Sequence, residues 1–123
     1  MGVFSVRVEL LSRDGSRQVE FDAVVDAGAT FTKVTPAVAH DLGLVPEFRS
    51  RVRLGNGEFV SREVGPLLLR WQDTTATIPV AIGGEGEVPV LGATALEILG
   101  LWVDPSGRSL VFRDALDLVM AAV

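Results

Sequence analysis

The chain has 123 residues, of which 48% are apolar and 22% are charged, a composition typical of a folded globular protein and not of a disordered one. Its formal net charge of −5 argues against nucleic acid as the main partner, because phosphate binding needs a positive surface. The chain has no cysteine and one histidine, which excludes disulfides, thiolate catalysis and cysteine-bound zinc, and disfavours His-rich metal sites and serine triads.

The length favours a single domain that covers residues 1–123. No stretch reaches the roughly 20 apolar residues that cross a bilayer, and the N-terminus lacks a signal-peptide pattern. We therefore expect a cytoplasmic protein with no membrane partner. Its mean hydropathy of +0.38 is high for a small monomer, which suggests an apolar surface kept for a partner.

Two strands and a polar turn open the predicted fold. Residues 3–10 alternate apolar and polar side chains, residues 13–16 have turn composition, and residues 17–25 alternate again. This hairpin delivers Asp26 at the end of its second strand, followed by the small residues Ala27-Gly28-Ala29. Taken alone, an aspartate at such a place is more often a turn or N-cap residue than a reactive group.

A short strand and a short helix follow. Residues 31–34 predict the strand, and Thr35 and Pro36 suit the N-cap and the first position of a helix. Gly43 suits the end of that helix, because glycine readily adopts the left-handed conformation found after helix C-termini.

An Asn-Gly pair in the middle of the chain predicts a second hairpin. Residues 49–54 and 58–64 flank Gly55-Asn56-Gly57, and such a pair between alternating segments is a strong hairpin signal. An ordinary surface hairpin explains this local pattern as well as a functional loop does. The first strand of this hairpin carries Arg49, Arg51 and Arg53 on one face. Such a face is most often solvated, but it could contact an acidic substrate.

The second half of the chain predicts further strands. Residues 67–72 and 76–82 surround a polar turn at 73–75, and residues 88–91 form another apolar run. The glycine-rich segment 83–86 lacks the spacing of a phosphate loop and the helix that would follow one, so a flexible connection is the better interpretation.

A second helix is predicted after the last apolar run. Thr94 and Glu97 have the spacing of a capping box at its start, and Gly100 suits its end. Two short strands, 101–103 and 110–112, follow around a polar turn.

Large apolar residues near the end of the chain suggest a core or an interface. Trp71 and Trp102 are expected in one of these two places. The apolar residues of segment 115–123 recur at helical spacing, although a terminal strand at an interface would also fit.

One short pattern occurs twice. Gly28-Ala29-Thr30 and Gly92-Ala93-Thr94 each follow an apolar strand and precede a predicted helix. The second copy has Val90 where the first has Asp26, so only one of the two turns is acidic.

Two carboxylates that share one proton can perform chemistry that a lone carboxylate cannot. When two lie about 3 Å apart both cannot ionise, so one stays protonated while the other can deprotonate a water molecule. With one acidic turn per chain, such a pair requires two chains related by a two-fold axis. Gly28 and Ala29 would let two such loops approach closely and leave room for a substrate backbone.

In their order along the chain these motifs resemble those of the retropepsin-like aspartic proteases, particularly the small bacterial single-lobe members. The family pattern has an apolar pair before Asp-Thr/Ser-Gly, then a glycine-rich hairpin called the flap, then two apolar residues and a Gly before a helix. The matching segments are VVDAGAT at 24–30, LGNGE at 54–58 and VLG at 90–92. The resemblance covers residues 4–113.

The resemblance implies an all-β-dominated fold, a retropepsin-like closed barrel with one or two short helices, assembled as a symmetric homodimer. It implies an aspartic endopeptidase in which Asp26 and its mate activate a water that hydrolyses peptide bonds of a peptide or protein substrate, with no cofactor and no metal. The residues that it implies in substrate binding are Ala27, Gly28, Ala29, Thr30, Gly55, Asn56, Gly57 and Glu58.

Ala27 departs from the family pattern. The family has Thr or Ser there, whose hydroxyl forms hydrogen bonds across the dimer and holds the two Asp loops in register, and Ala27 has no such group. The alternative function is therefore a catalytically weak or silent dimerisation module of the same fold that binds extended peptides by strand addition.

Overall fold

The computed structural model describes residues 4–104, 106 and 108–112. Its strands are β1 (Ser5–Leu11), β2 (Gln18–Asp26), β3 (Thr32–Val34), β4 (Phe48–Arg53), β5 (Phe59–Trp71), β6 (Thr74–Ile82), β7 (Val90–Gly92), β8 (Leu101–Asp104) and β9 (Ser109–Phe112). Its helices are α1 (Pro36–Asp41) and α2 (Ala93–Leu99). The predicted fold class, mostly β with two short helices, is confirmed.

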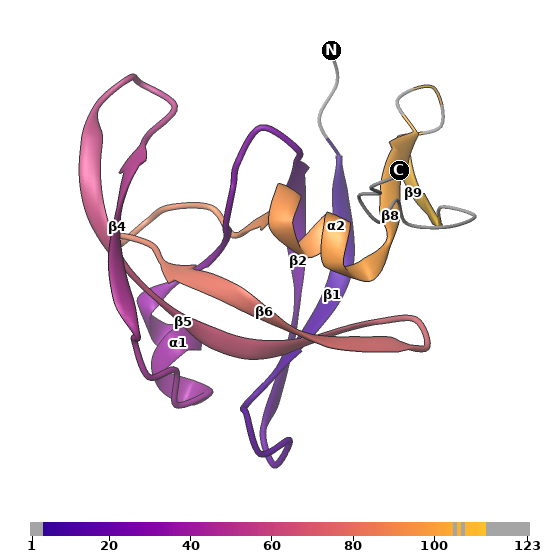
Figure 1. The fold of residues 1–123 in the computed structure, drawn as a ribbon, viewed down its shortest axis with the longest axis horizontal. Helices are drawn as coiled ribbons and strands as arrows, with labels where there is room; N and C mark the ends of the chain where they lie inside the picture. Colours follow the sequence, from indigo (N-terminus) through magenta and orange to yellow (C-terminus); the bar gives the residue numbers. More distant parts are fainter. Residues whose placement is uncertain (1–3, 105, 107, 113–123) are drawn as a thin grey trace, which may run out of the picture.

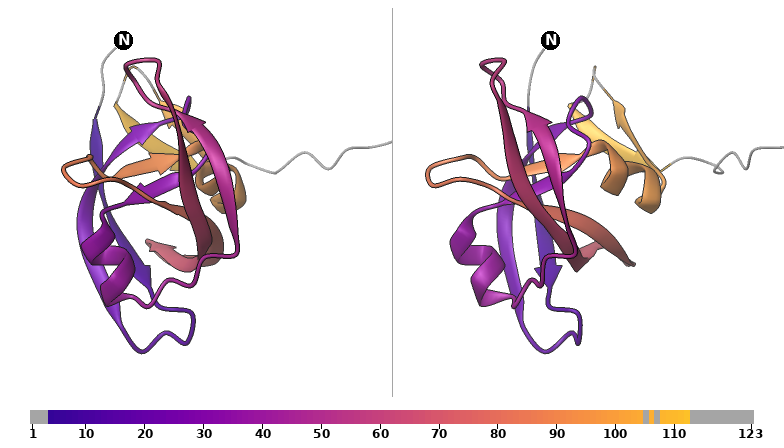
Figure 2. Two further views of the ribbon diagram at one scale, coloured as in Figure 1. Left: turned by 90° about the vertical axis from the view of Figure 1, so that its left-hand side faces the viewer. Right: turned by 60° about the vertical axis from the view of Figure 1, so that its left-hand side comes forward.

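The main sheet closes on itself. Its strands follow the order β1-β2-β7-β3-β6-β5-β4, and β1 also pairs with β5, so six of the strands form a barrel and β4 extends beyond it. β4 and β5 therefore form a hairpin that projects from the barrel wall (Figure 1). In the turned views of Figure 2 the same hairpin crosses in front of other strands, and its tip reaches beyond them.

Alternating apolar side chains fill the barrel. Leu67 and Leu69 on β5 are fully buried, as are Ile78 and Val80 on the neighbouring β6. The period of two follows from the pleat, which turns every second side chain toward the interior. α2 packs against the same core and buries Ala95, Leu96 and Leu99.

The start of α1 is as the sequence predicts. Thr35 is the N-cap, and its Oγ1 accepts a hydrogen bond of 3.2 Å from the Val38 N–H. Pro36 is the first helical residue, and Gly43 follows the helix with a φ of 64°. None of the helices in the described part of the chain is long and apolar enough to cross a membrane.

The capping box predicted for α2 is wrong. Gly92 is the N-cap of this helix and has no side chain to cap it, and Thr94 lies inside the helix. The first N–H groups of α2 have other acceptors, because Ala93 N–H donates to Ala29 O at 2.6 Å and Thr94 N–H donates to Thr30 O at 3.1 Å. The backbone of the Asp26 loop thus takes the place of a capping side chain.

The predicted break between residues 64 and 67 is also wrong, because β5 continues through it as one strand. Gly65 allows this, since a Cβ there would collide with the Val45 carbonyl. Pro66 faces Pro79 of β6 in the ladder. The turn after β5 comes earlier than predicted, at Gln72 with a φ of 53° and Asp73, since Thr74 and Thr75 already pair within β6.

The two tryptophans have different environments. Trp71 is partly buried against the core, and its ring lies 5.6 Å from that of Phe112. Trp102 on β8 is 53% exposed, so a core position is wrong for it and an interface position stays a prediction. The predicted strands after α2 are confirmed as β8 and β9, and segment 115–123 lies outside the described residues.

Candidate active site

Asp26 lies at the end of β2, where the strand leaves the barrel. Its Oδ1 accepts a hydrogen bond of 2.9 Å from the Gly28 N–H, and its carbonyl accepts one of 3.1 Å from the Ala29 N–H. A Cβ at Gly28 would lie 3.2 Å from Oδ1, so a larger residue there would press on the carboxylate. The turn therefore holds Asp26 from both its backbone and its side chain while the residue itself stays exposed.

The repeated Gly-Ala-Thr pattern has a spatial meaning. β2 and β7 are parallel neighbours, and Asp26 is directly opposite Gly92 in their register. The two strand ends therefore lie side by side, and the loop after β2 bonds to the start of α2 through the two amide contacts described above. The expected strand–turn–helix device is complete only in the second copy, because β3 separates the Asp26 turn from α1.

Thr32 contributes a contact that the sequence interpretation missed. Its side chain is buried, with 2% of the residue exposed, and its Oγ1 accepts a hydrogen bond of 3.1 Å from the Gly92 N–H. The alternation over residues 31–34 places Thr32 on the inward face with Val34. A buried polar side chain needs a hydrogen-bond partner, so a threonine at an inward position of the strand is the signal that predicts such a contact.

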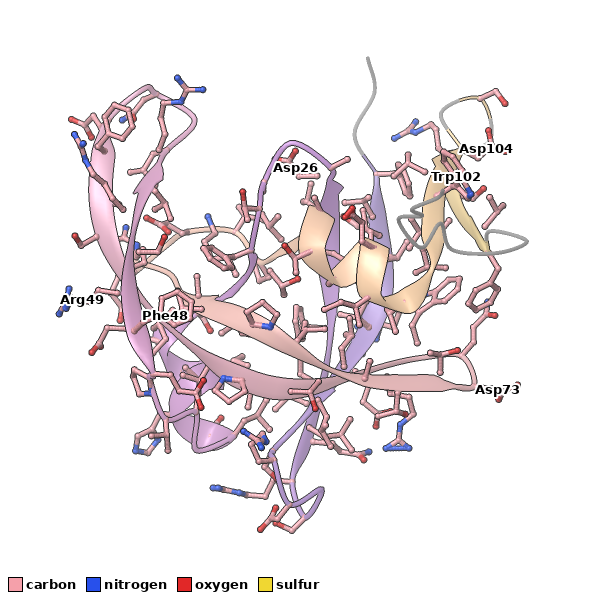
Figure 3. The ribbon with its side chains drawn as sticks, viewed as in Figure 1. Asp26, Phe48, Arg49, Asp73, Trp102 and Asp104 are labelled. Carbon is pink, nitrogen blue, oxygen red and sulfur yellow. The ribbon has the colours of Figure 1, made fainter. Side chains whose placement is uncertain are left out.

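A cleft of about 570 Å³ separates the Asp26 loop from the β4–β5 hairpin. Figure 3 shows Asp26 at the end of β2, across from that hairpin. The cleft is lined by five of the predicted site residues, namely Asp26, Gly28, Ala29, Thr30 and Gly55. Four other predicted residues are not among those that line it: Ala27, Asn56, Gly57 and Glu58.

The tip of the hairpin is a compact five-residue loop, 54–58. Gly57 N–H donates to Leu54 O at 2.9 Å, Leu54 N–H donates to Glu58 O at 2.7 Å, and Asn56 Oδ1 accepts from the Glu58 N–H at 2.9 Å. Gly57 has a φ of 91°, whereas Asn56 has a negative φ. The predicted hairpin is confirmed, and within Gly55-Asn56-Gly57 only Gly57 has a positive φ.

We expect Gly57→Val to destabilise this tip, because a β-branched residue is strained at positive φ by roughly 1–2 kcal/mol. No heavy atom lies within 4 Å of a Cβ at this position, so the cost comes from the backbone and not from a clash. Amide hydrogen exchange at residues 54–58 should accelerate in the variant. Unchanged exchange would show that the turn does not need the glycine.

Three charged side chains meet in the cleft although they are far apart in the sequence. Glu87 Oε2 lies 2.6 Å from Arg62 Nη2, and Glu87 Oε1 lies 3.4 Å from Lys33 Nζ. A hydrogen bond from the Gly84 backbone, together with Arg62 and Lys33, holds the pKa of Glu87 below its ordinary value against the effect of burial. We refer to Lys33, Arg62 and Glu87 as the cleft ion cluster.

The described residues contain no group of three or more His, Cys, Asp or Glu side chains that could hold a metal ion. The chemistry that the described cleft offers is that of a carboxylate in a small-residue turn, next to a cleft of about 570 Å³.

Comparisons with known proteins identify the family. The family model described as aspartyl protease matches residues 8–93, which is more than half of the chain. A search of curated proteins by sequence found no match.

Three solved structures share the fold. A retropepsin-like aspartic protease from Rickettsia conorii has a TM-score of 0.56 and 22% identity, over 85% of this chain and 87% of that one. EIAV protease, in complex with the inhibitor HBY-793, has a TM-score of 0.56 and 17% identity, over 80% and 89%. The retroviral protease-like domain of Ddi1 from Leishmania major has a TM-score of 0.53 and 16% identity, over 90% of each chain. The chain belongs to the aspartyl protease family and has a retropepsin-like fold.

Proposed function

We propose that this protein is an aspartic endopeptidase that acts as a homodimer, with the Asp26 side chains of two copies as its catalytic pair. The observation that carries the proposal is a single exposed carboxylate, held in a Gly-Ala turn and facing a cleft of about 570 Å³. Family membership supports the same chemistry.

In this proposal the second carboxylate of the catalytic pair is Asp26 of another copy of the chain. The described part of the cleft offers no other carboxylate that lacks a cationic partner. Of the described residues that line it, only Asp26 and Glu87 are acidic. Glu87 is engaged by Arg62 and Lys33 and has a lowered pKa, so it stays ionised and cannot share a proton with Asp26. A two-fold axis next to the Asp26 loop would supply an identical group.

Paired in this way, the two carboxylates hold one proton between them. The ionised Asp26 takes a proton from a water molecule, whose oxygen attacks the peptide carbonyl carbon, while the protonated Asp26 gives its proton to the carbonyl oxygen. The carboxyl group that took the water proton then gives it to the leaving nitrogen as the C–N bond breaks, and one hydroxyl of the tetrahedral intermediate returns its proton to the other carboxylate. The loop 54–58 acts as a flap that closes over the bound peptide and excludes water.

Exposed apolar residues support an interface at the end of the barrel that carries Asp26. Trp102 and Val111 are cross-strand neighbours on β8 and β9, and they are 53% and 43% exposed. The β8–β9 hairpin lies toward the same end of the molecule as the Asp26 loop (Figure 3).

Sedimentation at micromolar concentration, combined with cleavage of an unstructured peptide library at acidic and neutral pH, tests the proposal. A dimer that cleaves peptides is expected. A protein that stays monomeric under all conditions, or a dimer whose two Asp26 side chains lie far out of contact in a crystal structure, would overturn the paired mechanism.

One observation favours the silent peptide-binding module as a second candidate. Ala27 is exposed beside the Asp26 turn and provides no hydroxyl to join two loops. If the dimer is too weak to hold the carboxylates in register, the cleft would bind an extended peptide without cleaving it.

We expect Ala27→Thr to tighten the dimer and raise peptidase activity. A hydroxyl near the two-fold axis adds a hydrogen bond from each copy, and at about 0.5–1.5 kcal/mol per bond this tightens dimerisation roughly tenfold or more. Dimer dissociation constants and cleavage rates of the two proteins measure the effect. A weaker dimer with no gain in cleavage would indicate a steric clash, would count against placing Ala27 at the axis, and would favour the silent module.

A further inference from the structure

The cleft concentrates positive charge in an acidic protein. The chain has 11 Lys and Arg residues and 16 Asp and Glu residues. Four of those cations but only two of those carboxylates line the cleft: Lys33, Arg51, Arg53 and Arg62, against Asp26 and Glu87. Since one of the two carboxylates is the proposed catalytic group, the rest of the lining is distinctly basic.

The cleft ion cluster carries an excess of one positive charge. Glu87 has one carboxylate for two cations, and its two oxygens face Arg62 and Lys33 separately. The side chains are 20–26% exposed, so they remain accessible from the cleft while solvent screens them only in part. Arg62 Nε and Glu87 Oε1 are both buried without a hydrogen-bond partner among the described residues, so neither atom is open to the cleft. The Lys33 ammonium group has three donors and lies 3.4 Å from one Glu87 oxygen, so an incoming carboxylate can still bind it.

The three members come from separate parts of the site. Lys33 lies on β3, just after the Asp26 turn, and Glu87 lies in the connection before β7. Arg62 lies on β5 of the hairpin, directly opposite Ser50 on β4, which also lines the cleft. A group bound here would touch the barrel wall and the hairpin at the same time.

Resting on the peptidase function proposed above, we propose that this cleft selects peptides with a Glu or Asp side chain near the bond to be cleaved, bound by Lys33 and Arg62. Charge-assisted hydrogen bonds to a carboxylate are stronger than neutral ones, and the partly desolvated position strengthens them further. Glu87 holds the two cations in place and at the same time competes with the substrate for them.

Arg51 and Arg53 have a different part in this recognition. Both are exposed residues of β4 that line the cleft, whereas Arg49 is not among the lining residues and its side chain points away from the barrel (Figure 3). Arg51 lies over the Phe59 ring, 4.3 Å from its centroid. These two arginines raise the positive potential at the cleft and attract acidic peptides over a distance, an effect that salt screens.

The test separates binding from cleavage by using the full-length Asp26→Asn variant, which is not expected to hydrolyse what it binds. Fluorescent decapeptides that differ only by Glu or Gln at one central position are titrated against it, and binding is measured by anisotropy. At the preferred position we expect Glu to bind roughly tenfold more tightly than Gln. Equal binding of Glu and Gln peptides at every position would overturn the proposal. A wild-type protein that binds Glu peptides selectively but cleaves none would instead overturn only the peptidase function.

Two further substitutions should move the Glu preference in opposite directions. Lys33→Gln removes a cation and should lower the preference several-fold, whereas Glu87→Gln removes the competing carboxylate and should raise it. Arg49→Gln is the matched control, because Arg49 carries the same charge on the hairpin but is not among the residues that line the cleft. A general loss of structure would not give opposite signs. A fall in preference that is as large for Arg49→Gln as for Lys33→Gln would show that net charge alone is responsible.

Discussion

Asp26→Asn is expected to abolish peptide cleavage while leaving the fold intact. An amide cannot accept the proton of the attacking water, so the loss should reach at least the 10²- to 10⁴-fold typical of general acid–base groups. Asn keeps the shape of Asp, and its Oδ1 can still accept the Gly28 N–H that lies 2.9 Å from the carboxylate. The turn therefore has no reason to change.

The removal of charge should also favour association. Two Asp26 carboxylates brought together by a two-fold axis repel one another unless one is protonated, and two amides do not. We expect the variant dimer to be as tight as the wild-type dimer or tighter at neutral pH. Analytical ultracentrifugation and thermal melting, run beside peptide cleavage, measure these effects.

Asp22→Asn provides a matched control on the same strand. Asp22 is exposed on β2 and lies 3.5 Å from Arg7, outside the residues that line the cleft. Its replacement should leave cleavage unchanged. Cleavage retained by Asp26→Asn would mean that a different site, or a contaminant, is responsible, and the proposed mechanism would then be wrong.

The Asp26 turn could be predicted from the sequence because its signals are local. An apolar strand, a carboxylate and a run of small residues are contiguous over residues 24–30, and Gly55-Asn56-Gly57 marks its hairpin in the same way. The backbone preferences of glycine and the alternation of side chains along a strand depend on residues that are close in the sequence, so the sequence alone can predict these features. The N-cap Thr35 and the glycine that follows α1, Gly43, are local signals of the same kind.

The rest of the site could not be predicted because it depends on contacts between distant segments. The cleft ion cluster joins Arg62 to Glu87 across 25 positions, and no pattern around either residue indicates the other. The capping box fails for a related reason. Thr94 and Glu97 have the right spacing, but the helix already begins at Ala93, and the Thr94 amide that the Glu97 side chain would bind donates to the Thr30 carbonyl instead. Tertiary contacts override the local signal wherever a second segment satisfies the same groups.

Gly92→Ala is expected to have the largest effect on stability of any single-methyl change at the site. Gly92 lies opposite Asp26 in the parallel register of β7 and β2. A Cβ at Gly92 would collide with the Phe31 carbonyl and would lie 2.9 Å from the Ala29 carbonyl oxygen. Both groups are backbone of the Asp26 loop and cannot rotate away as a side chain could.

The collision forces the loop and β7 apart. That movement would strain the hydrogen bond from Gly92 N–H to Thr32 Oγ1 and the one from Ala93 N–H to Ala29 O. Overpacking against a rigid neighbour typically costs about 1–3 kcal/mol, and the strained hydrogen bonds add to it. We expect a fall in Tm of roughly 10 °C for a domain of this size.

The same substitution should impair catalysis at temperatures where the variant is still folded. The contacts that it disturbs fix the position of the Asp26 loop, and a misplacement of about 1 Å at a catalytic group can cost on the order of 10²-fold in rate. Thermal melting and peptide cleavage at 20 °C below the variant's midpoint separate the loss of stability from the loss of rate. Gly55→Ala is the control for stability, because no heavy atom lies within 4 Å of a Cβ there. A Gly92→Ala protein that melts and cleaves like the wild type would show that the Phe31 carbonyl can move aside freely. The close approach of β7 would then not be what holds Asp26 in place.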